Sequence, residues 1–306
     1  MRMLVVGAGS TGGYFGARLA AAGRDVTFLV RKRRAEQLQA AGLQILSPSG
    51  DLNISPKLVT SDRIDSTFDV ILLTVKSYGL EQALADFAPA VGSETLILPV
   101  LNGMRHMDVL AARFPAHNLA GCICKIASTL DDQGRIVELA RFHELAYGEL
   151  DGSASDRMTK LDAFMQNAGF DARISHAIQR EMWEKWTFLS SLGAINCLMS
   201  GSIGEVARSP GGREFANALL DEVLSVVRTV GVAPSDQFCA TVRAQLTDPE
   251  SNLTSSMYRD LQQGGPVESE QIVGDLVERA RRAGISTPLL SAANVRLSLY
   301  SARSQR

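Results

Sequence analysis

The residue best suited to acid–base chemistry is Lys185, which lies in the segment Met182-Trp183-Glu184-Lys185-Trp186. This segment is apolar and falls within a stretch of helical periodicity, Glu181–Leu198. Two tryptophans beside an ammonium group would keep water away from it, which suits a general acid at neutral pH. The alternative is a lysine at the edge of a helix, whose ammonium group reaches solvent while its stem packs on apolar groups. Composition alone does not separate these two interpretations.

Two polar residues follow predicted strands. Lys76 comes after the apolar run Val70–Val75, and Asn102 comes after the run Thr95–Val100. Because ligands bind at the carboxyl ends of parallel strands, both residues are candidates for contact with a cofactor or a substrate. The alternatives are a surface lysine and an Asn-Gly hairpin turn. However, the residues after the Asn-Gly pair predict a helix, Met104–Phe114, rather than a returning strand.

Ser256 and Glu268 are twelve residues apart near the end of the chain, on either side of Gly264-Gly265-Pro266. Proline is favoured at the start of a helix, so Pro266 predicts a helix with Glu268 in its first turn. A carboxylate at that position could serve a substrate site, or could simply interact favourably with the helix dipole. Both interpretations stay open for Glu268 taken alone.

A glycine-rich turn follows the apolar run Met3–Val6 and precedes helix-forming residues, Tyr14–Ala22. This is the context in which a GxGxxG motif binds a dinucleotide. Its first glycine allows a tight turn, its second lets the backbone approach a pyrophosphate, and its third lets the helix pack closely on the strand. The alternative is a glycine-rich turn without a ligand. The residues predicted to bind a cofactor here are Gly7, Gly9, Ser10, Thr11 and Gly12.

Basic residues follow the second predicted strand, Val26–Val30, at the point where NAD-dependent proteins usually carry an Asp or Glu for the ribose hydroxyls. Arg31 occupies that point, and Lys32, Arg33 and Arg34 come directly after it. Arginine can bind a phosphate through two parallel hydrogen bonds, so this basic run suits the 2′-phosphate of NADPH. A solvated basic loop is the alternative. The sequence therefore predicts NADPH rather than NADH as the cofactor.

The elements that must position these residues change in type along the chain. Strands alternate with helices in the first part, which predicts an α/β fold with a Rossmann-type, doubly wound, mostly parallel sheet. From about His176 onward helical periodicity dominates, so we predict an NADP-binding Rossmann domain at 1–175 and a helical substrate and catalytic domain at 176–306. Other expected strands are Gln44–Leu46, Lys57–Val59, Leu119–Ile126, Arg135–Ala140 and Leu145–Gly148, with a hairpin turn at Asp131–Gly134, and helices are expected at Arg34–Ala41, Glu214–Val230, Gln237–Leu246, Val267–Ala283 and Pro288–Tyr300.

Composition limits the functional classes. The chain has 306 residues, of which 45% are hydrophobic and 21% charged, with a formal net charge of −2, as expected for a soluble globular protein with two domains. Four cysteines and four histidines are scattered, without the spacing of a disulfide framework or a metal site, so no metal is expected. No apolar run is long enough to span a bilayer. We therefore expect a cytoplasmic protein that binds neither nucleic acid nor a membrane.

In their order along the chain, these residues resemble the ketopantoate reductase (2-dehydropantoate 2-reductase) family. The resemblance covers nearly the whole chain and rests on GAGSTGGYFG, TVKS, LNGM, MWEKW and, most specifically, SSMYRDLQQGGPVESE. It implies a Rossmann domain joined to a helical domain, with the active site in the cleft between them and NADPH as the cofactor. The implied reaction reduces a 2-oxo acid to a 2-hydroxy acid, 2-dehydropantoate to pantoate, in pantothenate biosynthesis. The expected partner is this small molecule, and a homodimer is compatible with the resemblance.

The resemblance also implies roles for single residues. Lys185 matches the catalytic lysine, which protonates the alkoxide that forms as hydride reaches the 2-keto carbon. Glu268 matches the glutamate that binds a substrate hydroxyl and helps to set the lysine. The remaining matches are Ser256 to a serine at the substrate carboxylate, Asn102 to an asparagine at the cofactor–substrate junction, Lys76 to a lysine of the cofactor region and Arg31 to the 2′-phosphate contact.

The chain departs from the family pattern at two positions. The family usually carries asparagines four and eight residues after the catalytic lysine, where this chain has Leu189 and Gly193. On a helix both share the face of the lysine, so we predict that they line the substrate site. Asn196 shares that face too, but it lies about 16 Å along the helix, too far to substitute. Losing two amides, at about 1 kcal/mol or more per hydrogen bond, favours a less polar 2-oxo acid as an alternative substrate.

Two other functions fit part of the sequence. A β-hydroxy-acid dehydrogenase also joins a Rossmann domain to helices and uses a lysine, but it does not explain SSMYRDLQQGGPVESE. A sensor that binds NADPH without turnover would be more attractive if Lys185 or Glu268 were missing, and both are present.

Overall fold

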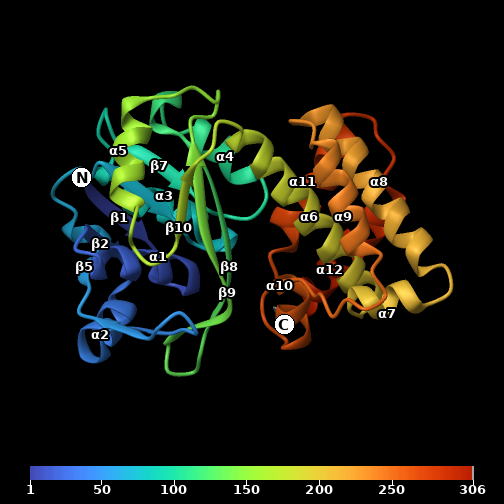
Figure 1. The fold of residues 1–306 in the computed structure, drawn as a ribbon, viewed down its shortest axis with the longest axis horizontal. Helices are drawn as coiled ribbons and strands as arrows, with labels where there is room; N and C mark the ends of the chain where they lie inside the picture. Colours follow the sequence, from blue (N-terminus) through green and yellow to red (C-terminus); the bar gives the residue numbers. More distant parts are fainter. Residues whose placement is uncertain (305–306) are drawn as a thin grey trace. The chain divides into compact units, whose positions relative to one another are not determined.

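The computed structural model describes residues 1–304, and the chain forms two compact units. The first unit contains Met1–Leu101 and His106–Gln179, and the second contains Asn102–Arg105 together with the chain from Arg180 onward. A four-residue segment from the N-terminal part of the sequence therefore groups with the C-terminal part. Figure 1 shows the first unit in blue to yellow-green and most of the second in yellow to red.

A five-stranded parallel sheet forms the centre of the first unit, in the strand order β5-β2-β1-β6-β7. The prediction of a mostly parallel, doubly wound sheet is confirmed, and the apolar runs form it because strands covered on both faces must be apolar throughout. The strand order changes direction between β1 and β6, which is the point where such sheets bind ligands. The bounds are β1 (Arg2–Val6), β2 (Asp25–Leu29), β5 (Lys57–Val59), β6 (Val70–Leu73) and β7 (Leu96–Pro99).

A second sheet belongs to the same unit, with the order β10-β9-β3-β4 and with β8 paired to β9. The predicted strand at Gln44–Leu46 joins this sheet rather than the parallel one, and Arg135–Ala140 and Leu145–Gly148 are parts of one long strand. The hairpin turn at Asp131–Gly134 is confirmed, since the Gly134 N–H donates to the Asp131 carbonyl oxygen at 2.9 Å. The bounds are β3 (Leu43–Leu46), β4 (Leu52–Ile54), β8 (Gly121–Leu130), β9 (Ile136–Gly148) and β10 (Asp171–Ile174), of which β10 was not predicted.

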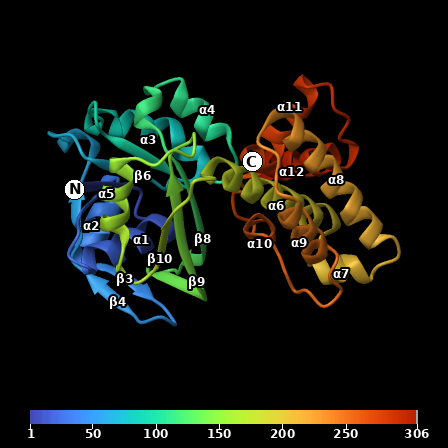
Figure 2. The ribbon, with the colours of Figure 1, turned by 45° about the horizontal axis from the view of Figure 1, so that its top comes forward.

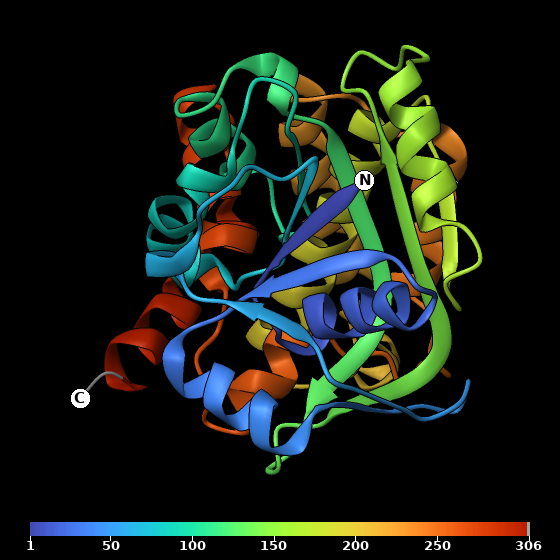
Figure 3. The ribbon, with the colours of Figure 1, turned by 90° about the vertical axis from the view of Figure 1, so that its left-hand side faces the viewer.

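Helix α1 (Ser10–Ala21) packs against strands of both sheets, against β1 and β2 on one side and β3, β4, β8 and β9 on the other. Figure 3 shows it in blue beside the long green strands β8 and β9. Tyr14 and Phe15 are fully buried at this position. The other helices that begin within residues 1–170 are α2 (Lys32–Ala41), α3 (Leu80–Phe87), α4 (Arg105–Ala111) and α5 (Asp156–Met165), with 3₁₀ turns η1 (Ser61–Arg63), η2 (Ser77–Gly79), η3 (Ala88–Ala90) and η4 (Ala116–Asn118).

A buried polar cluster joins α1 to the second sheet. The Tyr14 hydroxyl donates to the Glu138 carboxylate at 3.0 Å and lies 2.7 Å from His143 Nδ1, which is 2.8 Å from the other Glu138 oxygen. The Ser47 hydroxyl donates to the same carboxylate. Burial raises the pKa of Tyr14 to about 12, so its hydroxyl stays a donor. Burial also raises the pKa of Glu138, but the hydrogen bonds from Ser47, His143 and Tyr14 outweigh it and bring this pKa below its ordinary value.

Replacement of Glu138 by glutamine is expected to lower the free energy of unfolding at pH 7 by about 1–3 kcal/mol, because it weakens three buried hydrogen bonds. A carboxylate with a lowered pKa in the folded state stabilises the fold above its unfolded pKa of about 4.3, and this contribution is lost as the pH falls through the folded pKa. The difference between wild type and variant in urea unfolding should therefore shrink below about pH 4. Glu36→Gln, at an exposed position of α2, is the control and should change stability by less than about 0.5 kcal/mol. An equal difference at pH 7 and pH 3 would contradict the ionised cluster.

Within the described residues, the second unit contains helices and no strand (Figure 2). The predicted helix at Val267–Ala283 is wrong in its first part. Gly264 adopts a left-handed φ of 73° and the Gly265 N–H donates back to Asp260, so the chain leaves the preceding helix here and Glu268 comes before the next one. The bounds are α6 (Ile178–Met199), which begins in the first unit, α7 (Ile203–Arg208), α8 (Gly212–Val230), α9 (Asp236–Leu246), α10 (Ser256–Gln262), the π-helical η5 (Glu270–Gly274), α11 (Asp275–Arg282) and α12 (Pro288–Ser304).

None of the helices within residues 1–304 combines the length and apolar character that crossing a membrane requires.

Candidate functional site

The glycine turn after β1 is held on one side and open on the other. Gly7 has a φ of 100°, a left-handed conformation that favours glycine. The Thr74 hydroxyl, just beyond β6, lies 2.8 Å from the Val6 carbonyl oxygen and 3.0 Å from that of Gly7. A Cβ on Gly12 would overlap this hydroxyl, whereas a Cβ on Gly9 would meet no atom within 4 Å among the described residues outside its own stretch of chain. The turn is therefore fixed against Thr74 and leaves space beside Gly9.

Helix α1 begins at this open face, four residues earlier than Tyr14, where the sequence predicts it. Gly9 is its N-cap, and no side chain among residues 1–304 caps it. Ser10 and Thr11 lie in its first turn, which contains no acidic residue. Because the first N–H groups of a helix lack partners within the helix, this N-terminus is suited to an anion such as a pyrophosphate.

The basic run lies at the start of α2. Arg31 is the N-cap and is exposed, as Lys32 and Arg33 are. Cations at the positive end of a helix dipole are unfavourable, and a bound anion would relieve this. Arg34 differs from these three, because it is half-buried and donates to the carbonyl oxygens of Ala8 and Gly134, both at 3.1 Å. Burial lowers the pKa of its guanidinium.

Lys76 is exposed and lies three residues beyond β6, as the N-cap of η2. The predicted strand Val70–Val75 ends at Leu73, and the next two residues pass the glycine turn, since a Cβ on Gly7 would lie 3.3 Å from Val75 Cγ1. Lys76 therefore follows a strand end that directly contacts the predicted cofactor turn.

In the second unit, α6 carries Lys185 between two buried tryptophans. Trp183 is 5% exposed and Trp186 1%, and their ring centroids are 5.3 Å apart. Lys185 itself is half-buried. The neighbouring Glu184 has a separate task, because its carboxylate accepts hydrogen bonds from the Ser235 N–H and hydroxyl, both at 2.8 Å, at the start of α9.

The serine segment is tied to α6 by Asn196. This fully buried amide accepts from the Ser255 N–H at 2.8 Å and donates to the Gly201 carbonyl oxygen at 2.8 Å. Ser255 is the buried N-cap of α10, and its hydroxyl accepts from the Tyr258 N–H, whereas Ser256 is exposed at the first helical position. Asn196 therefore fixes where α10 and Ser256 begin.

Leu189 and Gly193 face different surroundings. Gly193 is buried, and a Cβ on it would lie 2.5 Å from Met257 Cε and 3.9 Å from Ser255 Oγ. A larger side chain at this position therefore requires the end of the Met257 side chain to move. Leu189 is only partly buried. In this unit Gly193 is thus a position where α6 packs on α10, in addition to sharing a helix face with Lys185.

Glu268 is 8% exposed and comes immediately before the helical residues Ser269 and η5. The segment that follows it is anchored to α6, since Trp186 Nε1 donates to the Ile272 carbonyl oxygen at 2.9 Å. π-helical stretches are rare and are found frequently at functional sites. This hydrogen bond connects Trp186, which is next to Lys185, with η5, which follows Glu268.

The Asn102-Gly103 turn packs on the same segment. Gly103 has a φ of 80°, and a Cβ on it would overlap the Gln271 carbonyl oxygen. Arg105 and Glu270 form an ion pair beside this contact. The turn is followed by α4 rather than by a strand, so it is not a hairpin. The second unit therefore brings together the segments that carry Asn102, Lys185, Ser256 and Glu268, around α6.

Two family models match most of the chain. The one described as "Ketopantoate reductase PanE/ApbA" covers residues 3–152, and the one described as "Ketopantoate reductase PanE/ApbA C terminal" covers residues 177–298. The chain belongs to the ketopantoate reductase family. It is therefore an oxidoreductase, and its family acts on small-molecule substrates with a nicotinamide cofactor.

Individual relatives and solved structures resemble the chain over nearly its whole length. A Bacillus subtilis protein named "Uncharacterized oxidoreductase YkpB" is 34% identical over 302 residues, which is 99% of each chain. A PanE/ApbA family ketopantoate reductase from Ralstonia eutropha has a TM-score of 0.88 at 23% identity, with all of both chains covered. A D-mandelate dehydrogenase solved with NADH and anilino(oxo)acetate has a TM-score of 0.87 at 19% identity, also over all of both chains. These two structures support the fold described above for this chain.

Sequence reasoning missed the roles that three residues of this chain have around the site, although Asn196 was considered there as a substrate ligand. Thr74 locks the glycine turn, Asn196 sets the start of α10, and Met257 fills the space beside Gly193. Thr74 lies in the TVKS segment, so its position directly after a buried strand was a usable signal. Asn196 and Met257 act on positions far away in the sequence, which no local pattern reveals.

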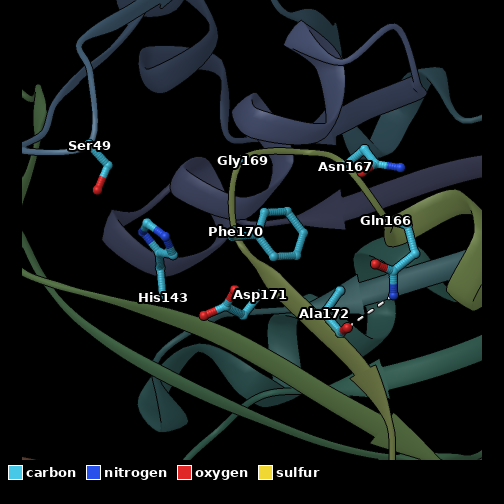
Figure 4. Close-up of a pocket in the computed structure, with 8 residues that line it drawn as sticks. All are labelled: Ser49, His143, Gln166, Asn167, Gly169, Phe170, Asp171 and Ala172. Carbon is cyan, nitrogen blue, oxygen red and sulfur yellow. Dashed lines mark hydrogen bonds between the residues drawn. The ribbon is translucent and has the colours of Figure 1, made fainter.

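A cavity of about 530 Å³ opens elsewhere on the first unit of this chain (Figure 4). It is lined by Ser49, His143 and residues of the segment 166–172, and none of the predicted site residues lines it. His143 reaches it from the buried Tyr14–Glu138 cluster. The cavity is therefore not part of the site predicted from the sequence.

Proposed function

We propose that this protein reduces a 2-oxo acid to a 2-hydroxy acid with NADPH, and that 2-dehydropantoate, which gives pantoate, is its first candidate substrate. The observation that carries the proposal is the arrangement in the second unit, where the segments of Asn102, Ser256 and Glu268 are anchored around the helix of Lys185. With 2-dehydropantoate as its substrate, the protein would act in pantothenate biosynthesis, and we expect it in the cytoplasm.

The first unit fits a dinucleotide. The open space at Gly9, the uncapped start of α1 and the cations at the start of α2 suit a pyrophosphate and a 2′-phosphate. Gly7, Gly9, Ser10, Thr11 and Gly12 would hold the former, Arg31 the latter, and Lys76 would contact the cofactor at the end of β6. When bound, the reduced nicotinamide supplies hydride to the substrate carbonyl carbon.

The residues of the second unit would supply the rest of the chemistry. The Lys185 ammonium donates a proton to the carbonyl oxygen as negative charge develops there, and Glu268 binds a substrate hydroxyl and orients the lysine. Ser256 binds the substrate carboxylate, and Asn102 lies where substrate and cofactor meet. Buried tryptophans beside Lys185 exclude water, so the proton comes from a fixed donor.

A second candidate substrate is a less polar 2-oxo acid, with a branched or aromatic side chain. Leu189 and Gly193 offer no amide to a substrate hydroxyl, and the space beside Gly193 is filled by the apolar end of Met257. Each missing hydrogen bond lowers the preference for a hydroxylated substrate by about 1 kcal/mol.

The experiment that tests the proposal is a comparison of NADPH oxidation with 2-dehydropantoate and with a panel of branched and aromatic 2-oxo acids. We expect turnover of 2-oxo acids, with 2-dehydropantoate among the substrates. A kcat/KM several times higher for an apolar 2-oxo acid would favour the second candidate, and a wide margin for 2-dehydropantoate would exclude it. Turnover of β-hydroxy acids alone, or nicotinamide binding without any turnover, would contradict the proposed reductase.

A further inference from the structure

Arg34 connects two segments that are far apart in the sequence. Its Nη2 donates to the carbonyl oxygen of Ala8, in the middle of the glycine turn, and to that of Gly134, in the β8–β9 hairpin, both at 3.1 Å. Its Nη1 donates to the side-chain oxygen of Gln37 at 2.7 Å. A guanidinium that is half-buried and has these three acceptors is oriented by the protein.

The hairpin is built to come this close. Gly134 has a φ of 75°, and a Cβ on it would overlap the side chains of Gln37 and Arg34. Gln37 donates to the Gln133 carbonyl oxygen at 3.0 Å, and the turn is closed by the ion pair between Asp131 and Arg135 at 2.7 Å. The hairpin therefore forms a firm support on one side of Arg34, with the glycine turn on the other.

The contact with Ala8 has a consequence for the next residue. The Ala8 carbonyl and the Gly9 N–H belong to one peptide group, which is planar and trans, so the two point in opposite directions. A charge-assisted hydrogen bond that holds the carbonyl toward Arg34 therefore holds the Gly9 N–H away from it. Without that bond, a peptide between two residues of a glycine-rich turn could rotate at little cost.

We propose that Arg34 is a positioning residue for the cofactor: with the β8–β9 hairpin as its support, it fixes the Ala8–Gly9 peptide so that the Gly9 N–H is presented to the dinucleotide pyrophosphate. The inference rests on the proposed use of a nicotinamide dinucleotide. This gives different roles to the first and last cations of the basic run 31–34. Arg34 acts on the pyrophosphate through the backbone, while Arg31 is the proposed contact of the 2′-phosphate.

The two roles predict different effects on NADPH and NADH, which share the pyrophosphate and differ in the 2′-phosphate. Lysine has one nitrogen in place of the planar fork, so it cannot hold the Ala8 and Gly134 carbonyl oxygens and, from a second nitrogen, the Gln37 side chain in the geometry of Arg34. Arg34→Lys is therefore expected to raise the Kd of both dinucleotides by the same factor, about tenfold, and to leave their ratio unchanged. Arg31→Ala should raise the Kd of NADPH alone, so that the ratio of the Kd of NADH to the Kd of NADPH falls.

The experiment measures the Kd of both dinucleotides by titration calorimetry, with the unfolding temperature of each variant. Arg24→Lys is the matched control, because Arg24 also bridges two backbone carbonyl oxygens, those of Phe164 (2.8 Å) and Gln166 (3.2 Å), away from the glycine turn. Arg24→Lys is expected to lower the unfolding temperature about as much as Arg34→Lys does, but both Kd values should stay as in the wild type. Gly134→Ala, whose methyl group would displace the ends of the Arg34 and Gln37 side chains without changing a charge, should weaken the binding of both dinucleotides by the same factor.

Three results would overturn the inference. A loss confined to NADPH in Arg34→Lys would make Arg34 a phosphate ligand, and unchanged Kd values would show that the peptide does not depend on it. If Arg24→Lys raised both Kd values as much as Arg34→Lys, the loss of affinity would come from general destabilisation of the fold. Wild-type protein that binds neither dinucleotide would instead refute the proposed function itself, and the inference with it.

Discussion

Replacement of Lys185 by alanine is expected to lower kcat for 2-oxo acid reduction by about 10²–10⁴-fold, the usual contribution of a general acid. The reason is that the developing negative charge on the carbonyl oxygen would lose its proton donor. The Kd of NADPH should stay unchanged, because Lys185 is proposed to act on the substrate carbonyl oxygen, and the residues proposed to bind the phosphates of the dinucleotide belong to the first unit. Single-turnover measurement of NADPH oxidation, combined with a binding titration, separates the two quantities.

The control for this variant is Glu184→Gln, at the adjacent position of α6. Glu184 binds the Ser235 N–H and hydroxyl at the start of α9, so its replacement should lower stability by about 1 kcal/mol while kcat is retained. If Lys185→Ala kept most of the wild-type kcat, the lysine would be a packing residue and the proposed mechanism would be wrong.

Gly12→Ala is expected to lower the stability of the fold, whereas Gly9→Ala is expected to lower only the affinity for NADPH. At Gly12 a methyl group would overlap the Thr74 hydroxyl and the Gly7 carbonyl oxygen, so overpacking should cost about 1–3 kcal/mol or more of stability, and dinucleotide binding should be lost with the turn. At Gly9 a methyl group would project into open space, since no atom of the described residues outside its own stretch of chain lies within 4 Å. That variant should keep the unfolding temperature of the wild type but lose most of its affinity for NADPH.

Thermal unfolding and a binding titration on both variants check this pair, in which each variant is the control for the other. A Gly9→Ala protein that binds NADPH as tightly as the wild type would mean that the pyrophosphate does not approach this glycine. A Gly12→Ala protein with an unchanged unfolding temperature would mean that the turn can move away from Thr74.

The parts of the fold that could be predicted from the sequence are those set by neighbouring residues. The apolar run Met3–Val6, the glycine turn and the run Val26–Val30 specify a βαβ unit within a short stretch of chain, and the unit is observed. Strand pairing over long separations was not predictable. Gln44–Leu46 reads as one more strand of the parallel sheet, but it pairs with Ile136–Val137 and with β4 in another sheet.

Residue types in the candidate site were predictable, whereas their surroundings were not. Lys185, Ser256 and Glu268 stand in motifs, so the sequence alone singles them out. That Gly193 faces Met257, or that Arg34 turns inward while Arg31 stays exposed, depends on which atoms the tertiary fold brings within a few ångströms. The start of the helix after Glu268 is wrong in the prediction because Pro266 favours a helix start at Val267, whereas residues 265–268 have no regular secondary structure after the turn at Gly264 and the helix begins at Ser269.

The membership of Asn102–Arg105 in the helical unit bears on how chimaeras of this protein could be engineered. A cut in the sequence between the two halves would leave Gly103 and Arg105 on one fragment and their packing partners, Gln271 and Glu270, on the other. Grafting the C-terminal half of a relative onto this N-terminal half therefore calls for transplanting the tetrapeptide as well, because the graft would otherwise combine a loop and a π-helix that never evolved together.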